Sequence, residues 1–314
     1  MENNIIFMGT PDFAVKSLDY LLKKNIKINC VITSPDKRSG RGLKLNQSEV
    51  KKYSELNEIK ILQPDNLFDI DFIQKIKNLN PILIVVVAYK KIPKILYEIP
   101  KYGAINLHAS LLPDYRGAAP INWCLMNNEK FTGVTTIRIN ERLDCGEILM
   151  QEKVLIDKDD DFETLKNKLA IIGSKILYRT IDLIFKNKIE SKQQIISKND
   201  KKAPKLNSEN TRINWNNSID SIIGNIRGLT PKPGAWTILY NDNQKIRIKI
   251  LKARAENYSV NKSNNNLSIR NRKIFISTLK GEIECEIIQL ENKKAMTAKD
   301  ILNGYKFSSN CYVK

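Results

Sequence analysis

The first 190 residues alternate between short apolar runs and segments in which apolar residues recur every three or four positions. The apolar runs span 5–8, 26–33, 59–62 and 82–88, and the periodic segments between them span 14–22, 50–56 and 72–76. Continuous β-branched runs separated by amphipathic helices are typical of a parallel sheet with helices on both faces. The pattern therefore predicts an α/β, doubly wound, mostly parallel sheet. Thr10 and Pro11 are predicted to be the N-cap and the first residue of its first helix.

Three further strands and one long helix are predicted to complete this first domain. The strands are expected at 103–108, 134–139 and 148–156. Apolar residues then recur at spacings of three and four from Phe162 to Ile176, with Asp161 as N-cap, which predicts a helix ending near Phe185. We therefore expect a catalytic α/β domain over 1–188.

The chain changes character after this helix. Residues 187–209 are rich in Lys, Asn and Ser and show no sustained periodicity, so a linker is predicted over 189–208. A short helix near 219–226 is then followed by strands with alternating apolar positions and by turn-rich stretches. About a hundred residues of this kind predict a small β-barrel over 209–314, similar to the oligonucleotide-binding fold.

Composition places the chain among ordinary globular proteins. It has 314 residues, 42% of them hydrophobic and 27% charged, and no apolar run approaches the roughly 18 residues that a membrane span needs. The N-terminal residues lack the pattern of a secretory signal. Five cysteines without CxxC spacing predict neither a disulfide framework nor a metal site. We therefore expect a soluble, cytoplasmic monomer that needs no membrane and no metal.

Positive charge is concentrated in the last third of the chain. The formal net charge is +18, and residues 201–314 contribute 21 Lys and Arg against 9 Asp and Glu. Residues 1–200 contribute 31 against 25. An excess of this kind is expected for a domain that binds a polyanion such as RNA. The competing interpretation is compositional drift, since Lys, Ile and Asn are abundant throughout.

The chain contains one histidine, His108, which follows Asn106 by two positions near the end of a predicted strand. Alternate residues of a strand point to the same side, so both polar side chains are displayed together while Leu107 faces the core. An irregular stretch containing Pro113 and Gly117 comes next, as is usual in binding loops. The simpler interpretation is a hydrogen-bonded loop histidine without a chemical role.

The segment NLHASLLPDYRGAAPINW closely resembles the folate-dependent formyltransferase family, which shares an Asn, His and Asp constellation. The matching aspartate is Asp144, in LDCGEIL. The resemblance continues over almost the whole chain through FMGTPDFAV, SPDKRSGRG, TPKPGAW and NKKAMTAKDILNG, in the family's order and with similar spacing. It supports the predicted fold and implies an enzyme.

The resemblance implies transfer of a formyl group from 10-formyltetrahydrofolate to an amino group. In the branch of the family with these motifs, the acceptor is the α-amino group of methionine on charged initiator tRNA, a step that enables translation initiation. Because the nucleophile belongs to the substrate, the enzyme must supply donors to the tetrahedral oxyanion and manage protons. Asn106 and His108 are expected to donate to the oxyanion, and Asp144 to orient the imidazole and favour its charged form.

The resemblance also implies where the folate binds. The expected cofactor-binding residues are Val87, Ala88, Tyr89, Ser110, Leu111, Leu112 and Pro113. The sequence departs from the family after Tyr89. Lys90 stands where glycine is usual, and one residue fewer separates Tyr89 from Pro93 than in the family. A left-handed backbone at that position would be strained by a lysine.

A basic loop follows the second predicted strand. Residues 34–44 contain two glycines and the cations Lys37, Arg38, Arg41 and Lys44. Without other information, such a loop is ordinary solvated surface. The resemblance implies instead that it enters the acceptor stem of the initiator tRNA, with Arg41 as the main contact.

Two alternatives remain open from the sequence. Relatives that act on a sugar nucleotide or on water share the same three polar residues, so the chemistry alone does not separate them from a tRNA enzyme. A catalytically inactive RNA-binding protein would also explain the charge and the barrel, although it would have no need of Asn106, His108 and Asp144. The basic C-terminal third favours the tRNA substrate.

Overall fold

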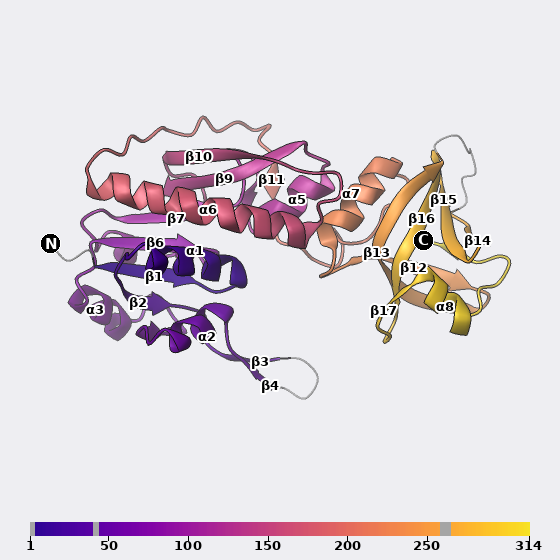
Figure 1. The fold of residues 1–314 in the computed structure, drawn as a ribbon, viewed down its shortest axis with the longest axis horizontal. Coiled ribbons are helices and arrows are strands. Elements are labelled where there is room, and N and C mark those ends of the chain that lie inside the picture. Colours follow the sequence, from indigo (N-terminus) through magenta and orange to yellow (C-terminus); the bar gives the residue numbers. More distant parts are fainter. Residues whose placement is uncertain (1–3, 40–43, 258–264) are drawn as a thin grey trace. The chain divides into compact units, whose positions relative to one another are not determined.

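The structure, a computed structural model, describes residues 4–39, 44–257 and 265–314 (Figure 1). Contacts group the chain into two compact units. The first comprises Met1–Gly117, Phe131–Leu155 and Lys166–Lys202, and the second comprises Ala118–Lys130, Ile156–Leu165 and Ala203–Lys314. The predicted domain boundaries at 188 and 208 stay predictions.

A seven-stranded sheet forms the centre of the first unit, in the order β10-β9-β7-β6-β1-β2-β5. The strands are β1 (Ile5–Gly9), β2 (Ile28–Ile32), β5 (Ile61–Leu62), β6 (Leu83–Val87), β7 (Ala104–His108), β9 (Phe131–Arg138) and β10 (Ile148–Leu155). The five from β7 to β5 pair in parallel, and β9 and β10 are antiparallel to their neighbours. The doubly wound, mostly parallel sheet predicted from the apolar runs is confirmed.

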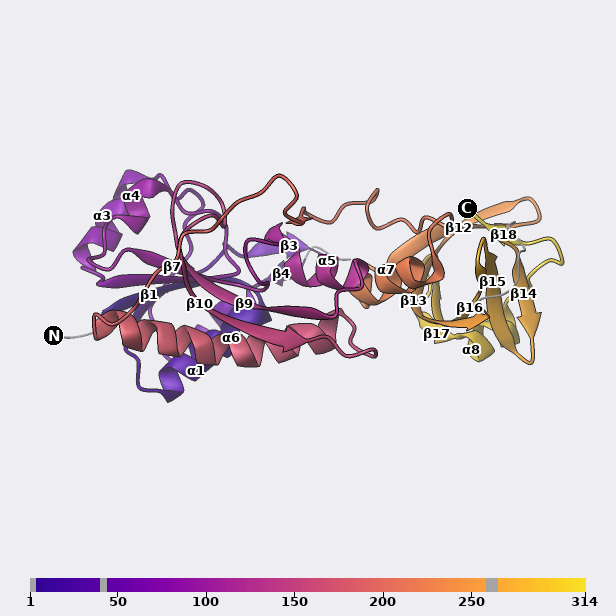
Figure 2. The same cartoon turned by 90° about the horizontal axis from the view of Figure 1, so that it is seen from above.

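Helices cover both faces of this sheet (Figure 2). On one side lie α1 (Asp12–Lys23) and α6 (Phe162–Phe185), and on the other α3 (Ile70–Asn78) and α4 (Lys94–Tyr97). α2 (Glu49–Leu56) follows β2 and the short hairpin of β3 (Lys37–Ser39) and β4 (Lys44–Asn46). The buried residues of α3 pack on the alternate side chains of β1 and β6 that face them. Each apolar stripe thus meets one face of the sheet.

The start of α1 differs from the prediction. The helix begins at Asp12 with Pro11 as its N-cap residue, and no side chain caps it. The Thr10 hydroxyl instead lies 3.0 Å from that of Ser34, which follows β2. Thr10 as N-cap is therefore wrong, because a partner distant in sequence takes its hydroxyl. At α6 the predicted cap is confirmed, since Asp161 Oδ1 accepts a 2.9 Å hydrogen bond from the Thr164 amide.

α6 approaches the sheet closely behind β7. A Cβ built on Gly173 would lie 3.0 Å from a methyl carbon of Leu107, so only a residue without a side chain fits there without displacement. Leu107 is buried at this contact. Because Asn106 and His108 alternate with Leu107, they face the other side of the sheet.

The second unit is a curled antiparallel sheet, a half-barrel, which confirms the barrel-like C-terminal domain. Its strands run in the order β14-β15-β16-β13-β12-β18, and β17 pairs with β16. They are β12 (Ala235–Asn241), β13 (Gln244–Asn257), β14 (Leu267–Arg270), β15 (Lys273–Thr278), β16 (Gly281–Leu290), β17 (Ala295–Thr297) and β18 (Tyr312–Val313). An antiparallel bridge between Asn266 and Tyr312 connects the two edge strands. α5 (Pro120–Met126), α7 (Ile219–Leu229) and α8 (Ala298–Gly304) complete the unit.

No helix within the described residues is long and apolar enough to cross a lipid bilayer.

Glu284 on β16 is a charged group within this half-barrel. Its side chain is 8% exposed, and its Oε2 lies 2.8 Å from Arg254 Nη2 and 3.1 Å from Lys273 Nζ. Burial raises the pKa of this carboxyl, but the hydrogen bonds from Arg254 and Lys273 outweigh burial and hold the pKa below its ordinary 4.5. The ionised carboxylate therefore stabilises the fold above that pH.

Replacing Glu284 with glutamine should lower the free energy of unfolding by about 1 kcal/mol near pH 7, because two charge-assisted hydrogen bonds are lost. The folded-state pKa is depressed, so the stabilisation is present above the unfolded pKa and is lost as pH falls through the folded value. The difference between E284Q and wild type should therefore shrink below about pH 4 in urea unfolding. Glu256→Gln, at an exposed neighbour, should change stability little; a pH-independent effect of E284Q would contradict the assignment.

Candidate functional site

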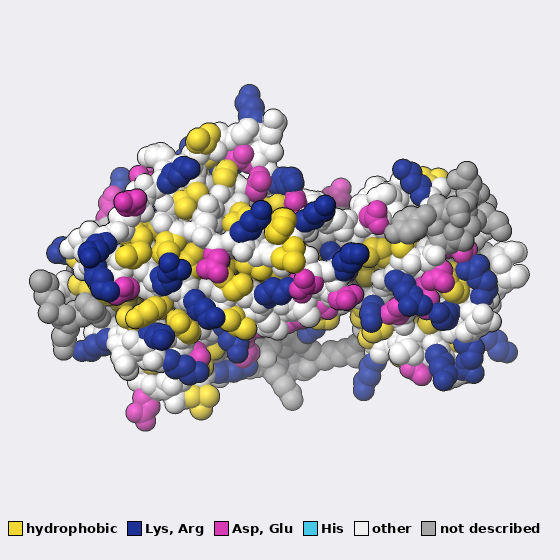
Figure 3. Space-filling view, turned by 45° about the horizontal axis from the view of Figure 1, so that its top comes forward, with side chains coloured by type: hydrophobic (Ala, Val, Ile, Leu, Met, Phe, Trp, Pro, Cys, Tyr) yellow, Lys and Arg dark blue, Asp and Glu magenta, His cyan; other side chains and the backbone are white. Residues whose placement is uncertain are grey.

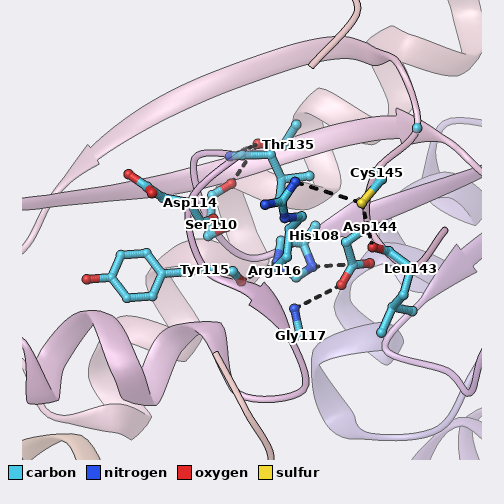
Figure 4. A network of polar contacts seen from close by, with 12 residues as sticks. His108, Ser110, Asp114, Tyr115, Arg116, Gly117, Thr135, Leu143, Asp144 and Cys145 are labelled. Atoms are coloured by element: carbon cyan, nitrogen blue, oxygen red, sulfur yellow. Dashed lines mark hydrogen bonds and ion pairs between the residues drawn. The ribbon is translucent and has the colours of Figure 1, made fainter. Parts of the chain in front are cut away.

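Two polar residues project from β7 on the face of the sheet opposite α6. Asn106 is half-buried and His108 is buried, with a side chain 7% exposed. The side-chain amide of Asn106 has no hydrogen-bond partner among the described residues. The sequence prediction that these side chains share one side of a strand agrees with this placement, and Figure 4 shows the surroundings of His108.

The protonation of His108 follows from its partner. Nε2 lies 2.9 Å from the carbonyl oxygen of Tyr115. A carbonyl only accepts, so Nε2 must carry a proton and donate it. Nδ1 is then the nitrogen left for chemistry: an acceptor in the neutral ring and a donor in the charged ring. It faces Asp144 Oδ1 at 3.8 Å, a distance suited to an ion pair but too long for a hydrogen bond.

Asp144 is held in place by its own backbone and by a neighbouring loop. It lies after β9 with φ +53°, a left-handed conformation that is uncommon outside glycine, and its Oδ2 accepts a 3.0 Å hydrogen bond from the Gly117 amide (Figure 4). A Cβ on Gly146 would lie 1.6 Å from the carbonyl oxygen of Arg138, so the loop packs tightly against the end of β9. These constraints bring Asp144 to His108.

A pocket lies where the loop after β6 and the loop after β9 meet over β7. Its lining includes Asn106 and Asp144, together with Tyr89, Lys90, Lys91 and Arg142. The Tyr89 hydroxyl is buried and has no hydrogen-bond partner within the described ranges. Burial raises the pKa of Tyr89 to about 12, so the phenol stays protonated at neutral pH.

The residues expected to bind folate do not all lie at this pocket. Tyr89 lines it, and Val87 and Ala88 directly precede Tyr89 at the end of β6. Ser110, Leu111, Leu112 and Pro113 are not among the residues that line it. Lys90 does line it, and the backbone strain expected there does not arise: the left-handed residue is Ala88, with φ +49°. The side chain of Lys90 is exposed and its Nζ lies 3.4 Å from the carbonyl oxygen of Asp65.

The loop of residues 110–113 is fastened from behind by two side chains that the sequence did not single out. Thr135 on β9 donates a 2.6 Å hydrogen bond to the Ser110 carbonyl and accepts one from the Leu112 amide at 3.2 Å. Gln151 on β10 donates to the Leu112 carbonyl at 2.8 Å. Nothing in the sequence pattern marks them, because their contact depends on the register of β9 and β10.

The predicted linker contains a segment that lies against the first unit. We call residues 192–201 the strap. Lys192 forms a bridge with Ile148 at the start of β10, and Asp200 Oδ2 lies 2.7 Å from Arg116 Nη2. Both members of this ion pair are nearly buried, with side chains 13% and 9% exposed. The strap is therefore bound beside the loop that carries Tyr115, not a free tether.

The basic loop is only partly described. β3 and β4 form a hairpin that projects from the sheet, and Lys37 and Arg38 are exposed on it (Figure 1). Lys44 begins β4. Arg41 lies outside the described residues.

Among the described residues no group of three or more His, Cys, Asp or Glu side chains could hold a metal ion. The polar side chains of this arrangement can transfer a proton at His108 Nδ1 and donate a hydrogen bond from the Asn106 amide.

Comparison with known proteins gives consistent matches. Residues 3–181 match the family model "Formyl transferase", and residues 205–306 match "Formyl transferase, C-terminal domain". The chain is 44% identical over 310 residues to a methionyl-tRNA formyltransferase of Thermodesulfovibrio yellowstonii, covering 98% of each chain. It is 41% identical to that of Flavobacterium johnsoniae, again covering 98% of each. Among solved structures it resembles WlaRD, a sugar 3N-formyl transferase, with a TM-score of 0.67, 24% identity and coverage of 94% and 100%.

Breaking the ion pair between Arg116 and Asp200 should be costly, because one buried charge is left without its partner. We expect Arg116→Met to lower the free energy of unfolding by about 3 kcal/mol. Combining it with Asp200→Leu should lower the free energy of unfolding by clearly less than the sum of the losses in the two single variants. Lys186→Met, which breaks the exposed pair with Asp182 (58% and 39% exposed), should cost under about 0.5 kcal/mol. Chemical denaturation measures all four, and additive losses would contradict a coupled buried pair.

Proposed function

Because the chain belongs to the formyl transferase family, we propose that it transfers the formyl group of 10-formyltetrahydrofolate to the α-amino group of methionine on charged initiator tRNA, the step that prepares this tRNA for translation initiation. The chain is a one-carbon transferase. The observation that carries the proposal is the convergence of Asn106, His108 and Asp144 beside one pocket. The tRNA acceptor is supported by relatives of that name matched over nearly their whole length.

In the proposed reaction the substrate's amine nitrogen attacks the formyl carbon, and a carbon–nitrogen bond forms as the carbonyl oxygen becomes an oxyanion. Asn106 donates a hydrogen bond to that oxyanion from the pocket wall. His108 Nδ1, the nitrogen not engaged by Tyr115, accepts a proton from the amine and, as Nδ1–H, donates a hydrogen bond to the oxyanion together with Asn106. The bond from the formyl carbon to the folate nitrogen then breaks, and that nitrogen takes the proton.

Asp144 acts on this reaction through the imidazole. Its carboxylate, held by the Gly117 amide and 3.8 Å from Nδ1, stabilises the positive ring that forms when Nδ1 takes the proton. The gap is wider than a hydrogen bond, so Asp144 does not engage Nδ1 in one. A developing charge and a fixed opposite charge in a half-closed site interact more strongly than in bulk water.

The pocket beside the three residues is proposed as the folate site. Tyr89 offers a protonated phenol, and the backbone of Val87 and Ala88 leads into it. Lys90, Lys91 and Arg142 place positive charge at its rim, which suits the carboxylates of a folate's glutamate tail. The related structure WlaRD was solved with 5-N-formyl-THF. For residues 110–113, a role in holding the folate remains part of the proposal, as does the contact of Arg41 with the tRNA stem.

The second unit offers a surface suited to RNA. Trp236 and Tyr240 alternate on β12, opposite Lys249 and Lys245 of β13. The Arg247 guanidinium carbon lies 4.0 Å from the centre of the Trp236 ring. The rings of Tyr240 and Tyr312 are stacked, 4.7 Å apart and 3° from parallel. Figure 3 shows more basic than acidic side chains over the visible face of this unit. Cations interleaved with flat rings are typical of nucleic-acid surfaces.

A sugar nucleotide is the second candidate acceptor. The likeness to WlaRD, at 24% identity, establishes a common fold and no substrate. The full-length match to the tRNA enzymes and the basic surface of the second unit favour tRNA.

Replacing His108 with alanine should reduce kcat at least a hundredfold with folding intact, since a positioned general acid–base group typically contributes about 10²- to 10⁴-fold to the rate. Asp144→Asn should also reduce kcat, while both variants keep the thermal unfolding temperature near that of the wild type. The assay combines 10-formyltetrahydrofolate with charged initiator tRNA, and charged elongator tRNA is the control substrate. Near-normal turnover of H108A would sink the mechanism, and formylation of an amino sugar nucleotide in place of tRNA would support the second candidate.

Replacing Arg247 with alanine should raise the KM for tRNA severalfold and leave the KM for folate unchanged. A lost phosphate contact should also reduce the slope of log affinity against log salt by about one. Lys186→Ala, which removes an exposed cation of the first unit already paired with Asp182, is the matched control and should leave both quantities near wild type. Equal effects of the two substitutions would argue against a specific role in RNA binding for the surface around Trp236 and Tyr240.

A further inference from the structure

The strap turns one side chain inward. Between residues 191 and 196 every side chain is exposed except that of Gln194, which is half-buried. Its neighbour Gln193 is exposed, and its side-chain amide lies 3.4 Å from the carboxylate of the half-buried Glu147. In this stretch the strap is held by the backbone bridge between Lys192 and Ile148 and by one inward side chain, that of Gln194.

Gln194 contacts the backbone of the loop that carries Asp144. Its Nε2 donates a 3.0 Å hydrogen bond to the carbonyl oxygen of Asp144 and a 2.7 Å hydrogen bond to that of Gly146. Both partners are carbonyls and can only accept, which identifies the NH₂ end of the amide as the one that faces them. One planar group thus binds the carbonyl oxygens of the two residues on either side of Cys145.

These two hydrogen bonds act on a strained backbone. Asp144 has φ +53°, a conformation that costs a non-glycine residue free energy and persists only where the surrounding structure holds it. Gln194 supplies such a hold at the Asp144 carbonyl, and the Gly117 amide supplies a second at the carboxylate. A change in the peptide orientation would swing the carboxylate relative to His108.

The other end of the amide argues against a purely stabilising role. Gln194 Oε1 is buried and has no hydrogen-bond partner among the residues that the structure describes. A buried acceptor without a donor lowers stability, because it has lost its hydrogen bonds to water. This loss of stability offsets much of the stability that the two donated hydrogen bonds contribute. Their main effect is therefore to fix the geometry of the loop.

We propose that Gln194 is a positioning residue for the reaction: it holds the loop of residues 144–146 so that the Asp144 carboxylate faces His108 Nδ1. This inference rests on the proposed role of Asp144 in formyl transfer. It assigns a chemical consequence to a segment that sequence composition identifies only as a linker.

The test compares kinetic constants of the full-length protein. Gln194→Met keeps the length of the side chain and removes both donors, and it should lower kcat about tenfold while each substrate's KM stays within about twofold. Gln194→Glu is closer still in shape but cannot donate, so it should lower kcat at least as much. Gln193→Met is the matched control and should keep wild-type constants. Wild-type kcat in both Gln194 variants would overturn the proposal.

A double-mutant cycle separates positioning from general destabilisation. If Gln194 acts through Asp144, adding Gln194→Met to Asp144→Asn should change kcat less than twofold, although it costs tenfold alone. Hydrogen exchange of the Gly117 amide, which donates to Asp144, should quicken in Q194M. A full tenfold loss in the D144N background would overturn the proposal. Near-normal kcat of D144N itself would instead refute the role of Asp144 and thus the proposed mechanism.

Discussion

The hydrogen bond from His108 Nε2 to the carbonyl oxygen of Tyr115 determines what the site can do. At 2.9 Å it fixes which nitrogen carries the permanent proton, and it turns Nδ1 toward Asp144. Tyr115 is able to offer that carbonyl because its backbone takes a left-handed conformation, φ +61°, in a buried loop. The loop is in turn held by Thr135 behind it and by Arg116 in its ion pair with Asp200. The tautomer of one histidine thus depends on contacts from three distant parts of the chain.

The sequence predicts the parts of the fold that follow from local periodicity. The apolar runs became β1, β2, β5 and β6, with ends within about two residues of the prediction, because a strand covered on both faces needs a continuous apolar run. The placement of Asn106 beside His108 also follows from strand geometry alone. The approach of Asp144 does not: it depends on the antiparallel register that sets His108 opposite Thr135, on the length of the loop after β9, and on a left-handed residue. Only the family resemblance identified that aspartate.

Composition does not show where the strap lies, for a physical reason. Polar residues without period predict the absence of a helix or a strand, and the structure agrees over most of 187–201. Periodicity is silent about where such a segment lies, because hydrogen bonds from single side chains have no repeat. Gln194 and Asp200 are among the polar residues that make the segment similar in composition to a linker. The same two residues bind it to the loops of the site. A polar, irregular stretch is therefore as consistent with a bound segment as with a free one.

The arrangement of charge in the second unit bears on whether its positive excess is compositional drift. Drift would distribute cations without regard to their neighbours. Here Arg254 and Lys273 meet the buried carboxylate of Glu284, and such pairs stabilise the sheet. Arg247 and Lys245 instead lie over the rings of Trp236 and Tyr240, on a surface that alternates flat rings with positive charge. A cation that lies over an aromatic ring keeps its charge available to a phosphate, because the ring contacts the aliphatic part of the side chain and orders it. The division into paired cations and ring-supported cations favours a surface shaped for a polyanion.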